Sequence, residues 1–200
     1  MAKINRSFYL CEDVVQIAKD LLGKYIFTNL NNEGLTGGII VETEAYEGIT
    51  DRASHAFGNR RTERTKIMFM EGGVAYIYLC YGIHSLFNIV TNKKNTPHAI
   101  LIRGIEPVQG LDIMLKRSGK IKPDKLFGIG PGKVAKILGI HFAQTGESLF
   151  GDKIWLEDRG IRVESSDIIT STRIGVDYAG LDAKLPYRFQ LIKKAPDKGA

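Results

Sequence analysis

Two short apolar segments joined by a tight turn constrain the fold of this chain more than any other feature of its sequence. Val74 to Cys80 and Ile83 to Thr91 are rich in β-branched and aromatic residues, and only Tyr81-Gly82 separates them. This pattern predicts a β-hairpin that carries an aromatic side chain at its tip. Because a hairpin joins antiparallel neighbours, we expect a sheet that is mainly antiparallel.

The rest of the chain changes between helix-like and strand-like patterns, so the predicted fold class is α+β with helices outside the sheet. Helices are expected at Cys11 to Lys24, with Gly23 as the C-cap, from Pro107 through Leu115, and at Lys133 to Leu138, which ends at Gly139. Strands are expected at Gly38 to Tyr46, Ala99 to Gly104, Lys153 to Glu157 and Gly160 to Val163. Two segments have no such pattern, the polar loop from Glu47 to Lys66 and the charged connector from Lys116 to Lys125. Loops as long as the first are usually functional or disordered.

Length and composition favour a single domain. The 200 residues are 44% hydrophobic and 25% charged, so we expect one compact domain over residues 1–200, with a flexible tail at 193–200. No apolar run approaches the roughly 20 residues that a membrane span requires, and the N-terminus leads into no signal-peptide segment. These features predict a cytoplasmic protein. Cys11 and Cys80 lie outside any Cys-x-x-Cys unit and are expected to be reduced thiols.

Basic residues gather in two stretches. Lysine and arginine outnumber aspartate and glutamate by 28 to 22, which gives a net charge of +6. The first stretch contains Arg60, Arg61, Arg64 and Lys66, and the second contains Lys116, Arg117, Lys120, Lys122, Lys125, Lys133 and Lys136. Such clusters suit a polyanion, because phosphate contacts supply most sequence-independent affinity for nucleic acids. Two solvated loops are the alternative explanation.

Glu44 is the first candidate for chemistry. Alternation along its strand would place Glu42, Glu44 and Tyr46 on one face, with Val41, Thr43 and Ala45 on the other. A carboxylate beside an aromatic side chain is a suitable general base. The nearby Glu42 also leaves open a two-carboxylate arrangement of the kind that glycosidases use, and an ordinary surface glutamate is the third possibility.

Three further positions carry polar groups in apolar strands. Arg103 ends the run Ala99 to Gly104 and needs an anionic partner, either a carboxylate such as Glu44 or a phosphate. A structural ion pair would satisfy it equally well. Asn88 could be a satisfied core amide. Tyr76 and Tyr78 share a strand face, and for Tyr76 we expect ordinary β packing.

Metal and nucleotide sites find little support in the sequence. The four histidines show no metal-ligand spacing, so we predict no metal. The run Gly128 to Lys133 is rich in glycine, but no serine or threonine follows the lysine as in a nucleotide-binding P-loop. The backbone at that helix start, together with Lys133, could instead contact a DNA phosphate.

Taken together, several blocks of this sequence resemble the alkyladenine (3-methyladenine) DNA glycosylase family in order and spacing. The blocks are Val41 to Tyr46, Ala53 to His55, Met68 to Met70, Tyr76 to Gly82, Asn88, Leu101 to Arg103, Glu106-Pro107, Gly130-Pro131 with Lys133, and Arg173 to Gly175. The resemblance covers nearly the whole chain. It implies a compact domain with a curved antiparallel sheet and a protruding hairpin, which acts as a monomer on double-stranded DNA and without a cofactor.

The resemblance also implies a role for individual residues. Tyr81 at the hairpin tip would enter the DNA and fill the space of a flipped nucleotide. Tyr46, His55 and Tyr78 would line the pocket that receives the flipped base, and Asn88 would exclude normal guanine by crowding its 2-amino group. Arg60, Arg61, Arg64 and Lys133 would contact the DNA backbone.

The implied chemistry is hydrolysis of the N-glycosidic bond of an alkylated or deaminated purine, as in base-excision repair. Glu44 would activate water and stabilise a cationic sugar, while Arg103 would hold the carboxylate or a nearby phosphate. No lysine lies in the matching catalytic blocks, so a monofunctional enzyme without a Schiff-base step is expected. Two alternatives stay open at this point: a non-catalytic module that binds damaged DNA, and a carbohydrate glycosidase that uses Glu42 and Glu44.

Overall fold

A computed structural model describes residues 2–192 of the chain. The tail predicted at 193–200 lies outside the described residues. The helices are α1 (Arg6–Tyr9), α2 (Val14–Asp20), α3 (Leu111–Ser118) and α4 (Pro131–Leu138). The strands are β1 (Tyr25–Asn29), β2 (Leu35–Tyr46), β3 (Val74–Cys80), β4 (His84–Thr91), β5 (His98–Gln109), β6 (Ile154–Glu157), β7 (Ile168–Ser171) and β8 (Arg188–Leu191). Short 3-10 turns are η1 (Phe57–Asn59), η2 (Lys66–Phe69), η3 (Phe142–Gln144), η4 (Ser165–Asp167) and η5 (Asp177–Lys184).

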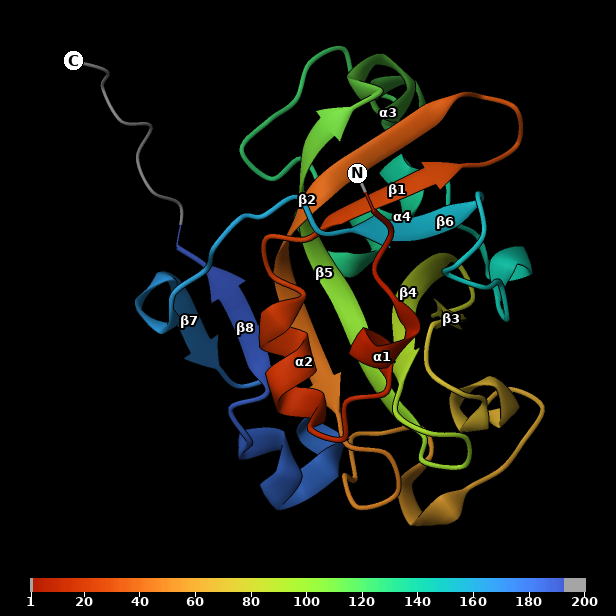
Figure 1. Ribbon diagram of the computed structural model, residues 1–200, viewed down its shortest axis with the longest axis vertical. Coiled ribbons are helices and arrows are strands. Elements are labelled where there is room, and N and C mark those ends of the chain that lie inside the picture. Colours follow the sequence, from red (N-terminus) through yellow and green to blue (C-terminus); the bar gives the residue numbers. More distant parts are fainter. Residues whose placement is uncertain (1, 193–200) are drawn as a thin grey trace.

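The described strands form one eight-stranded sheet in the order β3-β4-β5-β2-β1-β6, and β8 pairs with both β2 and β7. All of these pairings are antiparallel, which confirms the predicted α+β class and sheet type. Helix α2 packs in front of β2 and β5, and α4 lies on the other face of the sheet against β4 and β5 (Figure 1). Helices on both faces leave the long strands β2 and β5 in the middle of the molecule.

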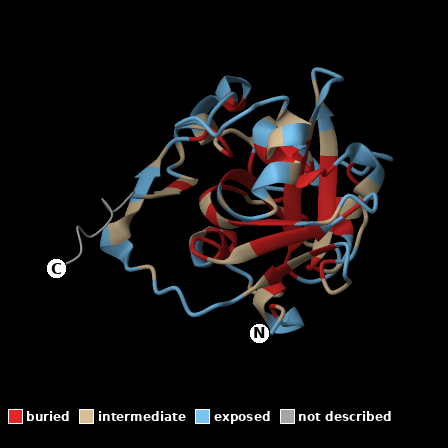
Figure 2. Ribbon diagram, turned by 90° about the horizontal axis from the view of Figure 1, so that it is seen from above, coloured by how far each residue is buried: buried red, intermediate tan, exposed pale blue. Residues whose placement is uncertain are grey.

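Apolar side chains from the sheet and from both helix layers build the main core. Ile17 from α2, Ile40 from β2 and Leu138 from α4 are among its buried members. Figure 2 shows buried residues concentrated in the central strands and in the helix faces against them. Two buried threonines add polar links across these layers. Thr43 donates to the Ala18 carbonyl of α2 at 2.8 Å, and Thr28 donates to the Leu138 carbonyl of α4 at 2.6 Å.

The hairpin of β3 and β4 forms as predicted, with its second strand starting one residue later. Its turn spans Tyr81, Gly82 and Ile83, and the Ile83 N–H donates to the Cys80 carbonyl at 3.2 Å. Tyr81 and Gly82 both have positive φ, of 52° and 73°. Two left-handed residues give the turn a twist that matches its strands, and Gly82 adopts such a φ without strain.

The first predicted helix is shorter than expected. Asp13 is its N-cap, because the Asp13 carboxylate accepts from the backbone N–H groups of Val15 and Gln16 at 2.9 Å. The C-cap is Leu21, and Gly23 instead donates its N–H to the Ile40 carbonyl of β2 at 2.9 Å. The prediction of one helix from Cys11 to Lys24 was therefore wrong at both ends.

Pro107 does not start a helix. It lies in β5 opposite Gly38, next to a register shift, where the missing N–H of proline is tolerated. Helix α3 begins at Leu111 after Gly110, which has a φ of 69°, and it extends through Ser118 into the predicted connector. Strand β5 is consequently longer than the predicted Ala99 to Gly104.

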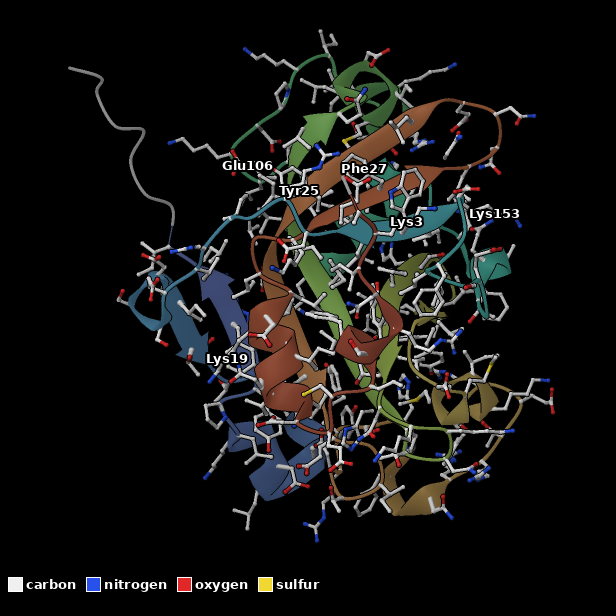
Figure 3. The ribbon with its side chains drawn as sticks, viewed as in Figure 1. Lys3, Lys19, Tyr25, Phe27, Glu106 and Lys153 are labelled. Atoms are coloured by element: carbon white, nitrogen blue, oxygen red, sulfur yellow. The ribbon has the colours of Figure 1, made fainter. Side chains whose placement is uncertain are left out.

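The predicted strand at Gly160 to Val163 is absent, and the chain there is irregular. Ile161 and Val163 lie against the backbone of Gly23, so their apolar character reflects local packing. Strand β1, which no pattern singled out, carries Tyr25 and Phe27 (Figure 3). The Phe27 ring stacks on Tyr25 and on Trp155 of β6, with ring centroids 6.2 and 5.6 Å apart.

Two small clusters attach the long loop from Glu47 to Lys66 to the sheet. Ala56 packs with Met68, Phe69 and Tyr76 in one of them. Ala53 packs with Val176 and Ala179 in the other, next to Tyr46. The loop is thus fixed between the hairpin and the segment that leads into η5.

Candidate active site

A cavity of about 340 Å³ opens where the hairpin, the long loop and the segment before η5 meet. Its volume is within the ~300–1,000 Å³ typical of small-molecule sites. Aromatic side chains dominate its lining, with few polar groups. The lining residues are Tyr46, Ala53, His55, Met68, Tyr76, Tyr78, Cys80, Tyr81, Leu86, Asn88, Ala99, Leu101, Arg103, Pro131, Ile174, Gly175, Val176 and Tyr178. The structure thus brings Tyr46, His55, Tyr78, Asn88 and Arg103 together around one space.

Glu44 lies directly behind this lining and has no exposed surface. Its Oε2 accepts from the Tyr46 hydroxyl at 2.8 Å, and its Oε1 accepts from the Ile174 N–H at 2.9 Å. The Arg103 Nε lies 3.4 Å from Oε1. All three partners line the cavity, so the Glu44 carboxylate lies one layer behind its wall.

Two bulges aim the charged side chains of this site. The pairing of β2 with β5 shifts register on both sides of Glu42, so that Val41 and Arg103 have no partner in the ladder. Bulges bend a strand and redirect its side chains, and they are frequent beside active sites. Gly104 is required here, because a Cβ on it would lie 2.9 Å from the Cβ of Glu42. Glu42 and Glu44 consequently share a face and both meet Arg103, as the alternation predicted.

Glu42 is held by two arginines. Its Oε1 accepts from Arg103 Nε at 2.9 Å and from Arg188 Nε at 2.7 Å. All three side chains are mostly buried. A carboxylate with two guanidinium partners is a counter-ion, so the geometry disfavours Glu42 as the second free carboxylate of a carbohydrate glycosidase.

Burial raises the pKa of Glu44, and the charge of Arg103 and the donors Ile174 and Tyr46 act in the opposite direction. A raised pKa makes a carboxylate a stronger base, which suits proton abstraction. The pKa of Tyr46 is raised well above its ordinary value, by burial and by the negative charge of Glu44. Tyr46 therefore stays a neutral phenol that donates to the carboxylate.

His55 is bonded at both ring nitrogens. Arg64 Nη2 lies 3.2 Å from its Nε2, and the Tyr76 hydroxyl lies 2.8 Å from its Nδ1. Because a guanidinium only donates, Nε2 accepts and Nδ1 carries the hydrogen. Burial, followed by Arg64 and Arg60, lowers the pKa of His55 to about 4. The imidazole is therefore neutral at pH 7. It meets the Tyr78 ring edge-on, with the two ring centroids 4.6 Å apart.

Tyr76 and Asn88 connect the neighbouring strands at the cavity wall. Asn88 Nδ2 donates to the carbonyls of Tyr76 at 3.1 Å and Leu86 at 3.3 Å, which fixes the orientation of its amide. Tyr76 was expected to be ordinary β packing, and its burial against Met68 and Phe69 confirms this. Its hydroxyl orients His55, and its ring lines the cavity.

Tyr81 stands at the rim of the cavity with 92% of its surface exposed, and its neighbour Ile83 is also exposed. Burying a tyrosine gains free energy, so two apolar side chains left in solvent at one hairpin tip indicate a contact surface. The tip projects beside the cavity that contains Tyr78 and Asn88.

A family model described as methylpurine-DNA glycosylase (MPG) matches residues 7–195. The chain belongs to this family.

Several bacterial relatives of the methylpurine-DNA glycosylase family are similar to this chain over nearly its full length. A protein of Chlamydia felis (strain Fe/C-56) is 46% identical over 191 residues, which cover 94% of this chain and 96% of the relative. A protein of Clostridium novyi (strain NT) is 42% identical over 198 residues, or 96% of both chains. A protein of Bdellovibrio bacteriovorus is 39% identical over 188 residues, or 93% of both chains. All three are named "Putative 3-methyladenine DNA glycosylase".

The basic residues of this glycosylase-family chain differ in whether they already contact other side chains of the protein. Arg60 is exposed and lines a second cavity of about 510 Å³ that adjoins the first at His55. The guanidinium carbon of Arg61 lies 4.0 Å from the centre of the Phe69 ring, and that of Arg64 lies 4.8 Å from the centre of the Tyr78 ring. Both arginines therefore already have partners within the protein.

The second basic stretch contains a residue that is not available to a ligand. Arg117 is buried, where its Nε donates to Glu33 at 2.8 Å and its Nη1 donates to the Ile137 carbonyl at 3.0 Å. It joins α3 to α4, so its assignment to a surface patch was wrong. Lys133 is exposed in the first turn of α4.

Sequence reasoning missed a second buried ion pair in this family member. Arg173 binds Asp51 with both terminal nitrogens, and their side chains have no exposed surface. Arg173 also donates to the Ala45 carbonyl at 2.9 Å and lies 4.8 Å from the Tyr46 ring. This pair holds Ile174 in place beside Glu44. The only signal in the sequence was the run Arg173 to Gly175, which gave no hint of a partner.

Arg188 was also missed, because a lone arginine in a four-residue strand gives no recognisable pattern. In residues 2–192, no group of three His, Cys, Asp or Glu side chains has an arrangement that could hold a metal ion. No helix formed by these residues has the length and apolar character that a membrane crossing requires.

Proposed function

We propose that this chain is a base-excision-repair glycosylase that removes alkylated or deaminated purines from double-stranded DNA and leaves an abasic site. The observation that carries the proposal is the position of Glu44 behind an aromatic cavity whose rim holds the exposed Tyr81. Bases inside a duplex are out of reach, so an enzyme that acts on them must take the base out of the stack.

In this proposal the flipped purine enters the cavity and stacks between aromatic walls formed by Tyr46, His55 and Tyr78. Stacking tolerates different purines because every base has a π-face. Asn88, with its amide fixed by two carbonyls, crowds the 2-amino group of normal guanine. Tyr81 fills the gap that the base leaves in the duplex.

The bond breaks when the purine leaves and the sugar takes on positive charge. Methylation at a ring nitrogen makes the purine cationic, so it leaves as a neutral base without an added proton. A deaminated purine such as hypoxanthine is neutral and takes up a proton from water as it leaves. Glu44 takes a proton from the attacking water and stabilises the cationic sugar through its charge. Arg103 holds Glu44 from the cavity side at 3.4 Å.

The reaction stops at the abasic site in this proposal. Strand cleavage by a glycosylase needs an amine that attacks the sugar, and no lysine is among the residues that line the cavity within the described part of the chain. Arg60, Arg61, Arg64 and Lys133 are all exposed and would contact the DNA backbone, although Arg61 and Arg64 also lie over the rings of Phe69 and Tyr78. We expect the protein to act as a monomer.

A duplex with a single 3-methyladenine or hypoxanthine tests this function. We expect release of the free base and an abasic strand that breaks only after alkali treatment, and borohydride should trap no covalent complex. Tight binding of the lesion duplex without base release would instead indicate a non-catalytic module that recognises damaged DNA.

A further inference from the structure

Arg103 lies between two carboxylates that compete for it. Its Nε is 2.9 Å from Glu42 Oε1 and 3.4 Å from Glu44 Oε1, so the contact with Glu42 is the shorter one. Without another cation, Glu42 would be the main partner of Arg103 and Glu44 the minor one. In a buried site such competition matters, because water screens the charges weakly.

Arg188 supplies the second cation. It lies on β8, where it pairs directly across from Glu44 in the β2 ladder. Its side chain nevertheless reaches along the strand to Glu42 and donates to Oε1 at 2.7 Å. A second bond, to the Ser171 hydroxyl at 3.4 Å, holds the guanidinium from β7. Two arginines and two glutamates then balance in charge.

We propose that Arg188 is a positioning residue, which by binding Glu42 leaves Arg103 available to hold Glu44 as the ionised base. The inference deepens the proposed function and rests on it for the role of Glu44. In this proposal the Glu42 carboxylate links the two arginines, and the β7–β8 hairpin contributes Arg188 to the site.

The charged and polar groups around Glu44 come from four parts of the chain. They are Glu42 and Tyr46 on β2, Arg103 on β5, the Ile174 N–H with the neighbouring Arg173 in the loop before η5, and Arg188 on β8. Of these, Glu42 disfavours the ionised form of Glu44, whereas Arg103 and the donors Tyr46 and Ile174 favour it. Because Arg188 acts through Glu42, its loss should shift the pKa of Glu44 in one defined direction, and this shift can be measured.

Titration of Glu44 in the free protein, followed by carboxyl ¹³C NMR and assigned with Glu44→Gln, tests the inference without DNA. Arg188→Met should raise the midpoint by on the order of one pH unit, because a nearby cation is lost. Glu42→Gln should lower it, and the double variant should titrate like Glu42→Gln alone, because Arg188 acts through Glu42. Arg188→Lys, which keeps the charge, should stay near wild type and covers the case in which the methionine variant does not fold.

An unchanged midpoint in a folded Arg188→Met protein would overturn the proposal, as would an Arg188→Met substitution that still raises the midpoint when Glu42 is already glutamine. A purely structural role for Arg188 predicts lower stability and no opposite shifts for Arg188→Met and Glu42→Gln. Base release by the wild-type protein is measured separately. If the wild-type protein releases no base, the proposed function is wrong, but the titration result still tests whether Arg188 positions Arg103 against Glu44.

Discussion

Tyr46→Phe removes a single hydroxyl from the site and keeps the aromatic wall. That hydroxyl donates to Glu44 Oε2 at 2.8 Å in a buried position. A hydrogen bond to a charged group contributes about 1.5–3 kcal/mol. One pKa unit corresponds to about 1.36 kcal/mol, so the pKa of Glu44 should rise by about one to two units in the variant.

The assay is the pH profile of single-turnover base release from a 3-methyladenine duplex. Glu44 must be ionised to accept a proton, so the rate falls as the pH drops through its pKa. In Tyr46→Phe this acidic limb should move to higher pH by about one to two units, because the charged form has lost a donor. At a pH on the wild-type limb, the rate should fall by about tenfold or more.

Tyr25→Phe is the matched control, because Tyr25 lies on β1 in the aromatic stack with Phe27 and Trp155. Its profile should coincide with that of the wild type. If the acidic limb of Tyr46→Phe also coincides with the wild type, the Tyr46 hydroxyl does not support the ionised Glu44, and the reasoning fails.

Four further predictions follow from the site. Tyr81→Ala should weaken binding of a lesion duplex by about 1–3 kcal/mol in fluorescence titrations, and unchanged affinity would exclude insertion of the ring. The imidazole of His55 should titrate near pH 4 by NMR in the free protein, since burial and arginines disfavour its charge, and a midpoint near 6.5 would contradict this. Arg173→Met should lower the free energy of unfolding by about 3–5 kcal/mol in denaturant, because Asp51 is left buried without its partner, and a loss below about 1 kcal/mol would count against it. Arg60→Gln should reduce the salt dependence of DNA binding by about one unit of slope, and an unchanged slope would remove it from the backbone contacts.

Local patterns predicted the parts of the fold that local physics determines. The hairpin followed from two β-rich runs around Tyr81-Gly82, and the end of α4 followed from Gly139, whose φ is 71°. The C-terminal limit of α2 could not be read in the same way, because apolar spacing continues past Asp20, through Leu21 and Leu22, into a turn. Pro107 gave a helix signal that the pairing of β5 with β2 overrides.

The same distinction between local patterns and distant contacts separates the site residues that could be predicted from those that could not. Glu44 and Tyr46 were predictable because alternation places them on one face of a single strand. Arg173 and Arg188 were not, since their partners Asp51 and Glu42 are more than one hundred residues away in sequence. The packing of Tyr76 was predictable from its strand, but the contact of its hydroxyl with His55 was not, because His55 lies in a loop without a regular pattern.

In the proposed mechanism Glu44 is the group that activates water, and single-turnover base release by Glu44→Gln tests this role directly. The variant should bind the 3-methyladenine duplex with wild-type affinity and release the base at least about 100-fold more slowly. Glu106→Gln, which changes an exposed glutamate on β5, should release the base at the wild-type rate (Figure 3). Base release by Glu44→Gln at a rate close to that of the wild type would contradict the central claim.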